Sequence, residues 1–294
     1  MRLLTFTDDG GTRIGVLKDE AIVDLGIAAP ELPREMVAFL EAGPAAMTRA
    51  REASAAAPAT LACSAVIIES PILRPPKILA TGLNYRDHAI EVGGPDARFP
   101  ERPVFFNKQS TAARAPYAPV YLPPESDQLD YEAELAVVIG RRCRRVAVED
   151  AAKVIAGYTI LNDLSLRDWQ FRAPTVLMGK SWDTHCPMGP VIVTPDELPQ
   201  PLALGIRTLV NGEMRQSSNT ENLIFDCGAL VAALSTVFTL EPGDVIATGT
   251  PGGVAAFRPG KPWLRVGDVV RVEIDGIGHI EARVEADPIG SFIQ

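Results

Sequence analysis

The chain is poor in histidine and in cysteine. Its three histidines and four cysteines are His88, His185, His279, Cys63, Cys143, Cys186 and Cys227. The cysteines are scattered and form no C-x-x-C pair, so the sequence indicates neither a zinc ribbon nor a disulfide framework. A chain without such pairs fits a reducing compartment, and we expect a cytoplasmic protein.

Long apolar runs and an excess of positive charge are also lacking. No run reaches the roughly 20 apolar residues that cross a membrane as a helix. The N-terminus begins with the strand-like segment Arg2–Phe6 instead of a basic and then apolar leader. The 37 acidic residues outnumber the 28 basic ones, giving a net charge of −9, which argues against nucleic acid or an anionic membrane as partner. We therefore expect a soluble, unprocessed protein.

The length of 294 residues allows one main domain with a small appendage. A strand-rich start is followed by helical patterns at Glu35–Glu41 and Pro44–Ala57, and then by a proline cluster near residue 71. From residue 77 onward the pattern predicts many short strands and few helices. We predict a mainly β protein with some α (α+β), with a small N-terminal α/β domain at 1–70 and a main domain at 71–294.

An acidic segment runs directly into an apolar one at residues 130–139. In an extended strand Asp130, Glu132 and Glu134 lie on one face, whereas the following Leu135–Ile139 is apolar on both faces. Asp163 likewise follows a strand-like run. An amphipathic edge strand with an acidic, solvated face is the simpler interpretation of the first segment alone, but two strands that end in carboxylates could converge.

Converging carboxylates would form a metal site. Three carboxylates without histidine or cysteine nearby suit Mg²⁺ or Mn²⁺ better than Zn²⁺. They would leave roughly three of six octahedral positions open for substrate and water. The sequence therefore predicts an open site for a hard divalent cation.

His88 and Glu91 lie three residues apart in a predicted helix that Asn84 can cap. This spacing places both side chains on one helical face, where they can touch. A carboxylate beside an imidazole fixes its tautomer and raises its basicity, as a general base requires. A chance pair on a surface helix is the alternative.

Three further residues could face the same cavity. Arg167 lies one turn after Asp163 on a predicted helix, and Gln170 lies one turn further; an ordinary intrahelical ion pair is the alternative. Lys180 could offset the charge of the carboxylates and stabilise an anionic substrate, although a surface lysine is the default.

The bend at residues 249–253 follows a short apolar strand. It matches neither a phosphate-binding loop nor a dinucleotide motif, so nucleotide binding is not predicted. The Thr250 hydroxyl and the backbone amides could bind a carboxylate. A plain tight turn is the alternative.

Together these segments resemble the fumarylacetoacetate hydrolase family, and in particular its shorter members. The resemblance spans about Lys77 to the end and depends on six motifs in order. These motifs are Gly82-Leu83-Asn84-Tyr85-x-x-His88-x-x-Glu91, Asp130-Tyr131-Glu132-x-Glu134, Asn162-Asp163-x-Ser165-x-Arg167-Asp168-x-Gln170, Gly179-Lys180-x-x-Asp183, Asn211-Gly212-Glu213 and Gly249-Thr250-Pro251.

The resemblance implies both a fold and a set of roles. The fold would be the mixed β-sandwich roll of the family, usually as a homodimer. By their motifs, Glu132, Glu134 and Asp163 would bind Mg²⁺ or Mn²⁺. His88 with Glu91 would activate water, Lys180 would complete the catalytic site, and the substrate contacts would be Arg167, Gln170 and Thr250.

The implied chemistry proceeds through an enolate. A 2-oxo acid would chelate the metal, and activated water would cleave a carbon–carbon bond of an acylpyruvate or related 2,4-dioxo acid. A decarboxylase of the oxaloacetate type, or an isomerase of an unsaturated dioate, would use the same site. From another class, a metal-binding protein without turnover is the remaining alternative, and the His88/Glu91 pair argues against it.

Overall fold

The computed structural model describes residues 1–288, 290, 291 and 293. Within this part of the chain the largest element is a mixed sheet of 12 strands. Its strands, in spatial order, are β4 (Leu61–Ala62), β3 (Ala21–Asp24), β2 (Gly11–Lys18), β1 (Arg2–Asp8), β14 (Cys186–Val193), β12 (Ile155–Asn162), β11 (Ala133–Ile139), β17 (Val245–Ala247), β6 (Ile78–Gly82) and β7 (Val104–Lys108), with β5 (Ile67–Ile68) paired to β1 and β8 (Ala113–Arg114) to β14.

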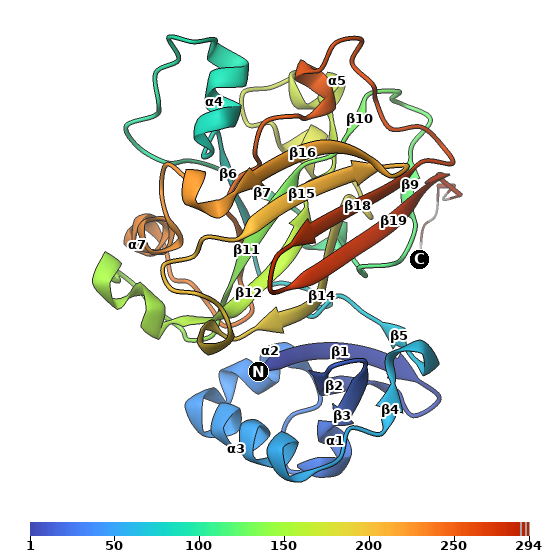
Figure 1. Cartoon of the computed structure of the whole chain (residues 1–294), viewed down its shortest axis with the longest axis vertical. Helices are drawn as coiled ribbons and strands as arrows, with labels where there is room; N and C mark the ends of the chain where they lie inside the picture. The colour runs from blue at the N-terminus through green and yellow to red at the C-terminus, as the bar shows by residue number, and fades with distance from the viewer. Residues whose placement is uncertain (289, 292, 294) are drawn as a thin grey trace.

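A second sheet lies against the middle of the first (Figure 1). Its order is β16 (Glu213–Asn219), β15 (Gly205–Val210), β18 (Val269–Ile274), β19 (Gly278–Ala286) and β9 (Val120–Leu122). The short strands β10 (Leu129–Asp130) and β13 (Ser165–Leu166) pair separately. The layers form a sheet-rich sandwich, which confirms the predicted mainly β fold with some α.

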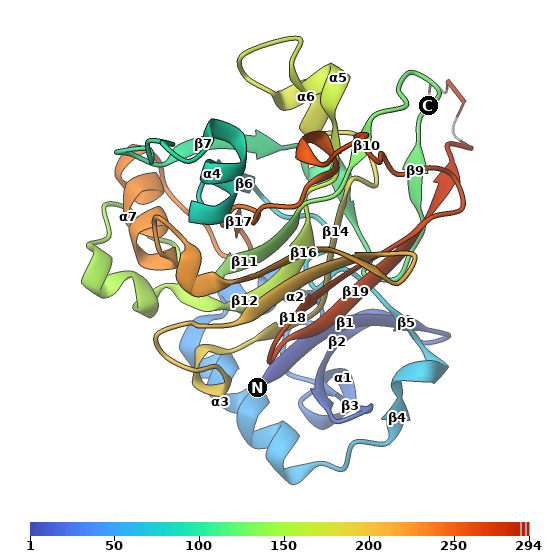
Figure 2. The same ribbon diagram turned by 45° about the horizontal axis from the view of Figure 1, so that its top comes forward.

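Helices are short and surround the sheets. They are α1 (Leu25–Ala28), α2 (Met36–Glu41), α3 (Gly43–Ala56), α4 (Arg86–Gly93), α5 (Arg167–Gln170), α6 (Leu177–Lys180) and α7 (Cys227–Val237), with 3₁₀ helices at Cys63–Ala65, Ser110–Ala112, Val148–Lys153, Pro195–Glu197, Thr220–Asn222 and Ala255–Phe257. Figures 1 and 2 place α4, α5 and α6 at the end of the molecule opposite the N-terminal strands. That end carries the candidate site.

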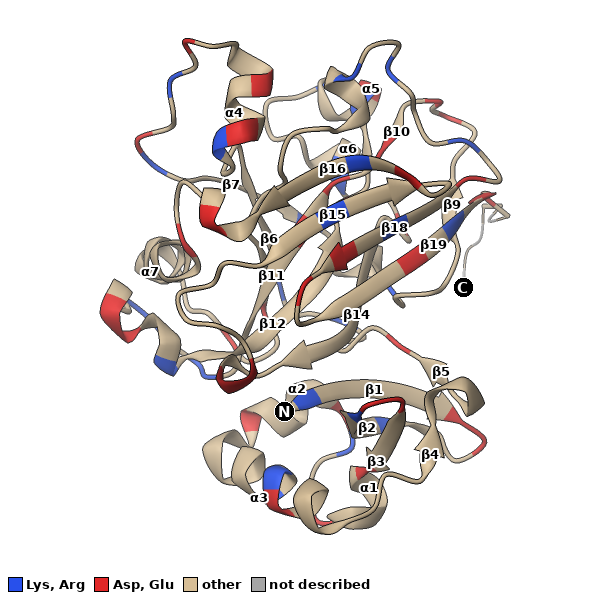
Figure 3. Ribbon diagram, viewed as in Figure 1, with Lys and Arg blue, Asp and Glu red and all other residues tan. Residues whose placement is uncertain are grey.

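Strand β11 is buried along its whole length because both of its faces are covered. Leu135 and Val137 pack into a core shared with the second sheet and α7, while Ala136 and Val138 pack into a core shared with α2 and α3. Figure 3 shows charged positions over most of the molecule, but β11 and β12 are almost free of them. This strand pair is a rigid apolar support for the few charges at its end.

The N-terminal residues are hydrogen-bonded to the rest of the fold. Strand β1 pairs antiparallel with β14, so that Arg2 lies opposite Val193 and Leu3 opposite Ile192. Adjacent side chains of β1 also pack into the two main cores. Leu4 belongs to the core that contains Leu135 and Val137, and Leu3 belongs to the core that contains Ala136 and Val138. The division of the chain into two domains, at 1–70 and 71–294, stays a prediction.

Some elements differ from what the sequence pattern indicates. The polar sequence of strand β16 has little strand character, but its residues pair with β15. The predicted helix from Asp163 through Gln170 is limited to Arg167–Gln170, because Ser165 and Leu166 pair with β10. No helix in the described residues has the length and apolar character of a membrane span.

Candidate active site

Three carboxylates meet where β11 begins and β12 ends. Glu132, Glu134 and Asp163 each offer an oxygen, and these oxygens lie within 4.8 Å of one another. The antiparallel pairing places Ala133 opposite Asn162, and the Asp163 amide donates to the Glu132 carbonyl at 2.9 Å. These distances confirm the convergence that the sequence predicts. The register of the buried strand pair explains it, because it fixes which residues lie at the shared end.

These carboxylates are almost completely buried, with Asp163 at 0% exposure and Glu134 at 1%. Buried charge persists only when opposite charge is close. Lys180 Nζ provides it, at 2.7 Å from Glu132 Oε2 and 2.8 Å from Asp163 Oδ2. Lys180 lies at the end of α6, where its ammonium is also 5.0 Å from the centre of the Phe106 ring. The predicted proximity of Lys180 to the carboxylates is thus confirmed.

Lys108 is another buried cation at the carboxylates, and sequence reasoning missed it. It ends β7 with a side chain at 0% exposure, and Nζ lies 2.6 Å from Asp163 Oδ1. The same Nζ also donates to the backbone carbonyls of Leu164 and Lys180. The available signal was weak: Lys108 shares a strand face with Phe106, two residues earlier, which is an unusual place for a lysine.

The pKa values of the glutamates diverge. Burial raises the pKa of Glu132, but the opposing charges of Lys180 and then Arg167 outweigh it and lower that pKa to about 2. Burial raises the pKa of Glu134 well above its usual value, and the negative charges of Asp163 and Glu132 raise it further. A cation bound among the three would offset this repulsion, so the oxygen-only donor set fits a hard divalent ion.

Asp130 does not join the three carboxylates, which corrects the prediction of one shared acidic face. Strand β10 ends at Asp130 and β11 begins at Ala133, so the alternation is broken between them. Asp130 instead accepts hydrogen bonds from the backbone amides of Ala255 and Ala256, at 2.7 and 2.9 Å. It also accepts from Arg167 Nε at 2.9 Å. Its role is to hold neighbouring segments together.

Arg167 is positioned by contacts that differ from those expected. The helix starts at Arg167, so Asp163 and Arg167 are not one helical turn apart. Arg167 forms ion pairs with Asp130 and, at 2.6 Å, with Glu132 Oε1. Its NH1 donates to Gln170 Oε1 at 2.7 Å, as the spacing of three residues predicts. Burial disfavours the charged form, but Asp130 and Glu132 outweigh it and raise the pKa of Arg167.

The His88/Glu91 pair forms as predicted on α4. His88 Nδ1 lies 2.9 Å from Glu91 Oε2, and the other carboxylate oxygen accepts from the Gly253 amide at 2.8 Å. Asn84 does not cap the helix, which is the one correction here. Its amide group instead bonds to the backbone of Phe225 and Thr248, because the N-cap position falls on Tyr85.

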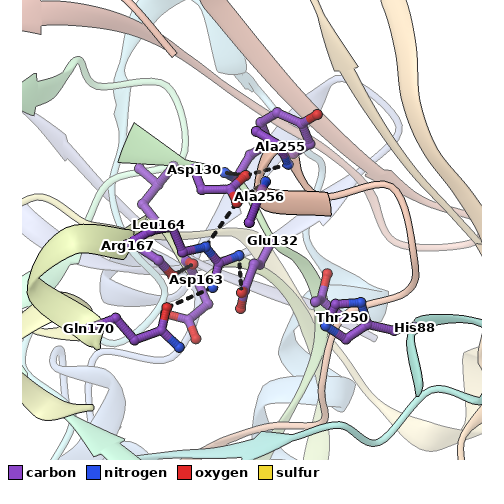
Figure 4. A network of polar contacts seen from close by, with 12 residues as sticks. His88, Asp130, Glu132, Asp163, Leu164, Arg167, Gln170, Thr250, Ala255 and Ala256 are labelled. Carbon is purple, nitrogen blue, oxygen red and sulfur yellow. Dashed lines mark hydrogen bonds and ion pairs between the residues drawn. The ribbon is translucent and has the colours of Figure 1, made fainter. Parts of the chain in front are cut away.

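All nine predicted site residues except Glu91 and Asp163 line one cavity of about 230 Å³. Figure 4 shows Arg167 and Gln170 on one side of Glu132, with His88 and Thr250 across from them. The cavity has an apolar part as well, formed by Leu83, Val92, Phe106, Phe171 and Phe257. A small ligand bound to the carboxylate end would therefore contact His88 and an apolar wall.

The bend after β17 contributes a backbone amide and a hydroxyl. Gly249 N donates to Glu134 Oε2 at 2.6 Å, so this amide does bind a carboxylate, one that belongs to the chain itself. Thr250 Oγ1 accepts from Gln216 Nε2 at 2.8 Å, which leaves its proton for a ligand in the cavity. A plain tight turn does not describe these contacts.

A model of the fumarylacetoacetate (FAA) hydrolase C-terminal family matches residues 77–285. The chain therefore belongs to this enzyme family, and the resemblance inferred from the six motifs is confirmed.

Curated relatives cover most of the chain. It is 43% identical to the mitochondrial oxaloacetate tautomerase fahd2 of Xenopus laevis over 286 residues, which is 95% of this chain and 89% of the relative. It is 46% identical to the oxaloacetate tautomerase YisK of Bacillus subtilis over 224 residues, covering 75% of this chain and 74% of that protein.

A solved structure shares the fold. The maleylpyruvate hydrolase from Sphingobium sp. SYK-6, in complex with manganese(II) and pyruvate, is 34% identical, with a TM-score of 0.80. The match covers 97% of this chain and 99% of that structure. The family thus includes enzymes named for tautomerisation and for hydrolysis.

Proposed function

We propose that the chain is a divalent-metal-dependent keto–enol tautomerase of a small 2-oxo dioate, with oxaloacetate as the first candidate. The observation that carries this proposal is that His88, paired with Glu91, lines the same cavity as Glu132 and Glu134. Two relatives named oxaloacetate tautomerase, at 43% and 46% identity, favour this reaction over the carbon–carbon hydrolysis expected from the motifs.

Glu132, Glu134 and Asp163 would hold Mg²⁺ or Mn²⁺. When bound, the ion would act as a Lewis acid that polarises the 2-oxo group and orients the adjacent carboxylate. Their buried oxygen ligands and the raised pKa of Glu134, caused by burial and by the two neighbouring carboxylates, support this assignment.

His88 would move the proton. Glu91 holds Nδ1, so Nε2 is the nitrogen available to take a proton from C3 of the keto form. Lys180 would compensate the negative charge that develops on the 2-oxo oxygen. Transfer of this proton from His88 to the 2-oxo oxygen completes the enol and regenerates the neutral imidazole, and the reverse sequence returns the keto form. Only a C–H and an O–H bond are exchanged, and no water is consumed.

The remaining cavity residues would orient the substrate. Gln170 and Thr250 can bond to the carboxylate remote from the metal, through an amide N–H and a hydroxyl. Arg167 would act indirectly, because its guanidinium is already bonded to Asp130, Glu132 and Gln170. It would hold Glu132 and Gln170 in place.

Hydrolysis of an acylpyruvate is the second candidate. The related hydrolase whose structure contains manganese and pyruvate supports it. In that reaction the same histidine would deprotonate a water that attacks a carbonyl, so the assignment of residues is shared. Decarboxylation of oxaloacetate is a further outcome of the same enolate chemistry.

One assay separates these reactions. Enol-oxaloacetate is supplied with Mg²⁺, its decay is followed by ultraviolet absorbance, and pyruvate is measured in the same sample. Fast decay without pyruvate supports tautomerisation, whereas pyruvate in step with decay indicates decarboxylation. Cleavage of acylpyruvates, with no faster enol decay than in buffer, would contradict the tautomerase. Turnover of none of them would favour a binding protein.

A further inference from the structure

Each of the three carboxylates has one oxygen held by a donor from the chain. Asp163 Oδ1 is bonded by Lys108 Nζ at 2.6 Å. Glu132 Oε1 is paired with Arg167 NH2 at 2.6 Å, and Glu134 Oε2 accepts from the Gly249 amide at 2.6 Å. The other oxygens are Asp163 Oδ2 and Glu132 Oε2, which both accept from Lys180 Nζ, and Glu134 Oε1.

The donors are themselves fixed. Lys108 Nζ is also bonded to the carbonyls of Leu164 and Lys180, and Arg167 is bonded to Asp130 through a second nitrogen. Gly249 has φ +104, and a Cβ there would lie 2.9 Å from the Asn84 side chain, so this amide depends on glycine. Lys108 and Arg167 therefore cannot swing away without breaking other buried contacts.

We propose that Lys108 is a positioning residue that, with Arg167 and the Gly249 amide, restricts each carboxylate to one metal-binding oxygen. Three single oxygens suit an octahedral ion that keeps several waters, as Mg²⁺ and Mn²⁺ do. Ca²⁺ takes six to eight oxygens and commonly uses both oxygens of a carboxylate. The arrangement therefore selects Mg²⁺ and Mn²⁺ over Ca²⁺. This inference rests on the metal dependence in the proposed function, and it does not depend on the reaction.

Lys180 would be the cation that moves when a metal binds. Its Nζ bonds to Glu132 Oε2 and Asp163 Oδ2, the two oxygens that Lys108 and Arg167 do not hold. Because Lys108 donates to the Lys180 carbonyl, the Lys180 backbone would stay in place while its ammonium moved from these oxygens toward the ligand. Lys108 would thus orient both a metal ligand and a catalytic side chain.

Metal selectivity tests the proposal. Dissociation constants for Mg²⁺, Mn²⁺ and Ca²⁺ are measured by calorimetry on the metal-free full chain and on Lys108→Met. The readout is the dissociation constant for Ca²⁺ divided by that for Mg²⁺. Loss of the lysine charge should change the affinity for both divalent ions by the same factor, and this factor cancels in the ratio. We expect this ratio to fall about tenfold, the lower end of the effect of residues that orient metal ligands. An unchanged ratio would overturn the proposal.

Lys77→Met is the matched control. Lys77 also pairs with a buried carboxylate, that of Asp244 at 2.6 Å, which is not one of the three. This variant should keep the wild-type ratio. A fall equal to that of Lys108→Met would contradict a specific role for Lys108.

A second measurement needs no variant. In a crystal structure of the wild-type protein with Mn²⁺, each carboxylate should ligate through one oxygen, with Lys108 still on Asp163 Oδ1. Ligation by both oxygens of Asp163 would overturn the proposal. Neither measurement involves turnover, so a protein that selects Mg²⁺ but fails to tautomerise oxaloacetate would contradict only the proposed reaction.

Discussion

Glu91 orients His88. One oxygen of the Glu91 carboxylate lies 2.9 Å from His88 Nδ1, while the other accepts the Gly253 amide at 2.8 Å. The carboxylate is thereby anchored to the bend that follows β17, the same bend whose Gly249 amide holds Glu134. The proton-transfer pair and the carboxylate cluster are joined through one backbone segment, which keeps their relative geometry fixed.

Removal of the His88 imidazole should abolish most of the reaction. We expect His88→Ala to lower kcat for enol-oxaloacetate ketonisation by roughly two to four orders of magnitude, the usual scale for a general base. Mg²⁺ affinity, measured by calorimetry, should stay at the wild-type value, because His88 is not one of the three carboxylates. Glu91→Gln should lose less activity, since the imidazole remains. Wild-type rates in His88→Ala would exclude this residue as the base.

Metal affinity should rise with pH. Burial and the charges of Asp163 and Glu132 raise the pKa of Glu134, so the metal-free site binds a proton there that the cation must displace. Below this raised pKa a proton on Glu134 competes with the metal ion, and above it the carboxylate is free of the proton and binds the ion more tightly. Calorimetry in buffers of different ionisation enthalpy should detect the proton that is released when Mg²⁺ binds. Glu134→Gln should abolish this proton release and most of the Mg²⁺ affinity. An Mg²⁺ affinity that is equal at all pH values would contradict the assignment of Glu134 as a metal ligand.

A buried histidine should make stability fall in mild acid. Burial lowers the pKa of His185 from 6.5 to about 4, and its Nε2 donates to the Tyr121 carbonyl at 2.7 Å. Between pH 6.5 and about 4 the unfolded chain takes up a proton at His185 that the folded chain does not. The free energy of unfolding is therefore unaffected by this group above pH 6.5 and declines as the pH falls toward 4. The loss should reach about 3 kcal/mol.

Urea unfolding at a series of pH values measures this decline. His185→Gln keeps a donor for the Tyr121 carbonyl without a titrating ring, so its stability should vary less with pH across the same interval. Parallel curves for wild type and variant would show that another group is responsible.

Asp130 should matter for stability and much less for metal. Asp130→Asn removes a buried charge that pairs with Arg167 at 2.9 Å, and breaking such pairs costs about 3 to 5 kcal/mol. We expect urea unfolding to show a loss of this order, while Mg²⁺ affinity falls far less than in Glu134→Gln. A metal affinity as low as that of Glu134→Gln would return Asp130 to the ligand set.

Short-range geometry made part of the site predictable. The helical period places His88 beside Glu91, and strand alternation places Glu132 and Glu134 on one face. Convergence with Asp163 followed from two buried strands that end in carboxylates. Each inference needed only local periodicity and a simple pairing of neighbours.

The rest depends on contacts distant in sequence. Lys108 meets Asp163 from an edge strand 55 residues earlier, and local periodicity carries no information about that contact. Asp130 leaves the acidic face because the amides of Ala255 and Ala256, far along the chain, hold it elsewhere. The homodimer and the cytoplasmic location likewise stay predictions.

Titration of the metal-free protein with Mg²⁺, while enol-oxaloacetate decay is recorded, tests the central claim most directly. The account predicts that the rate rises and saturates at one ion per chain, with the dissociation constant found by calorimetry, and that a chelator returns it to the buffer rate. A chain that binds no ion, or that works equally well in chelator, would contradict it.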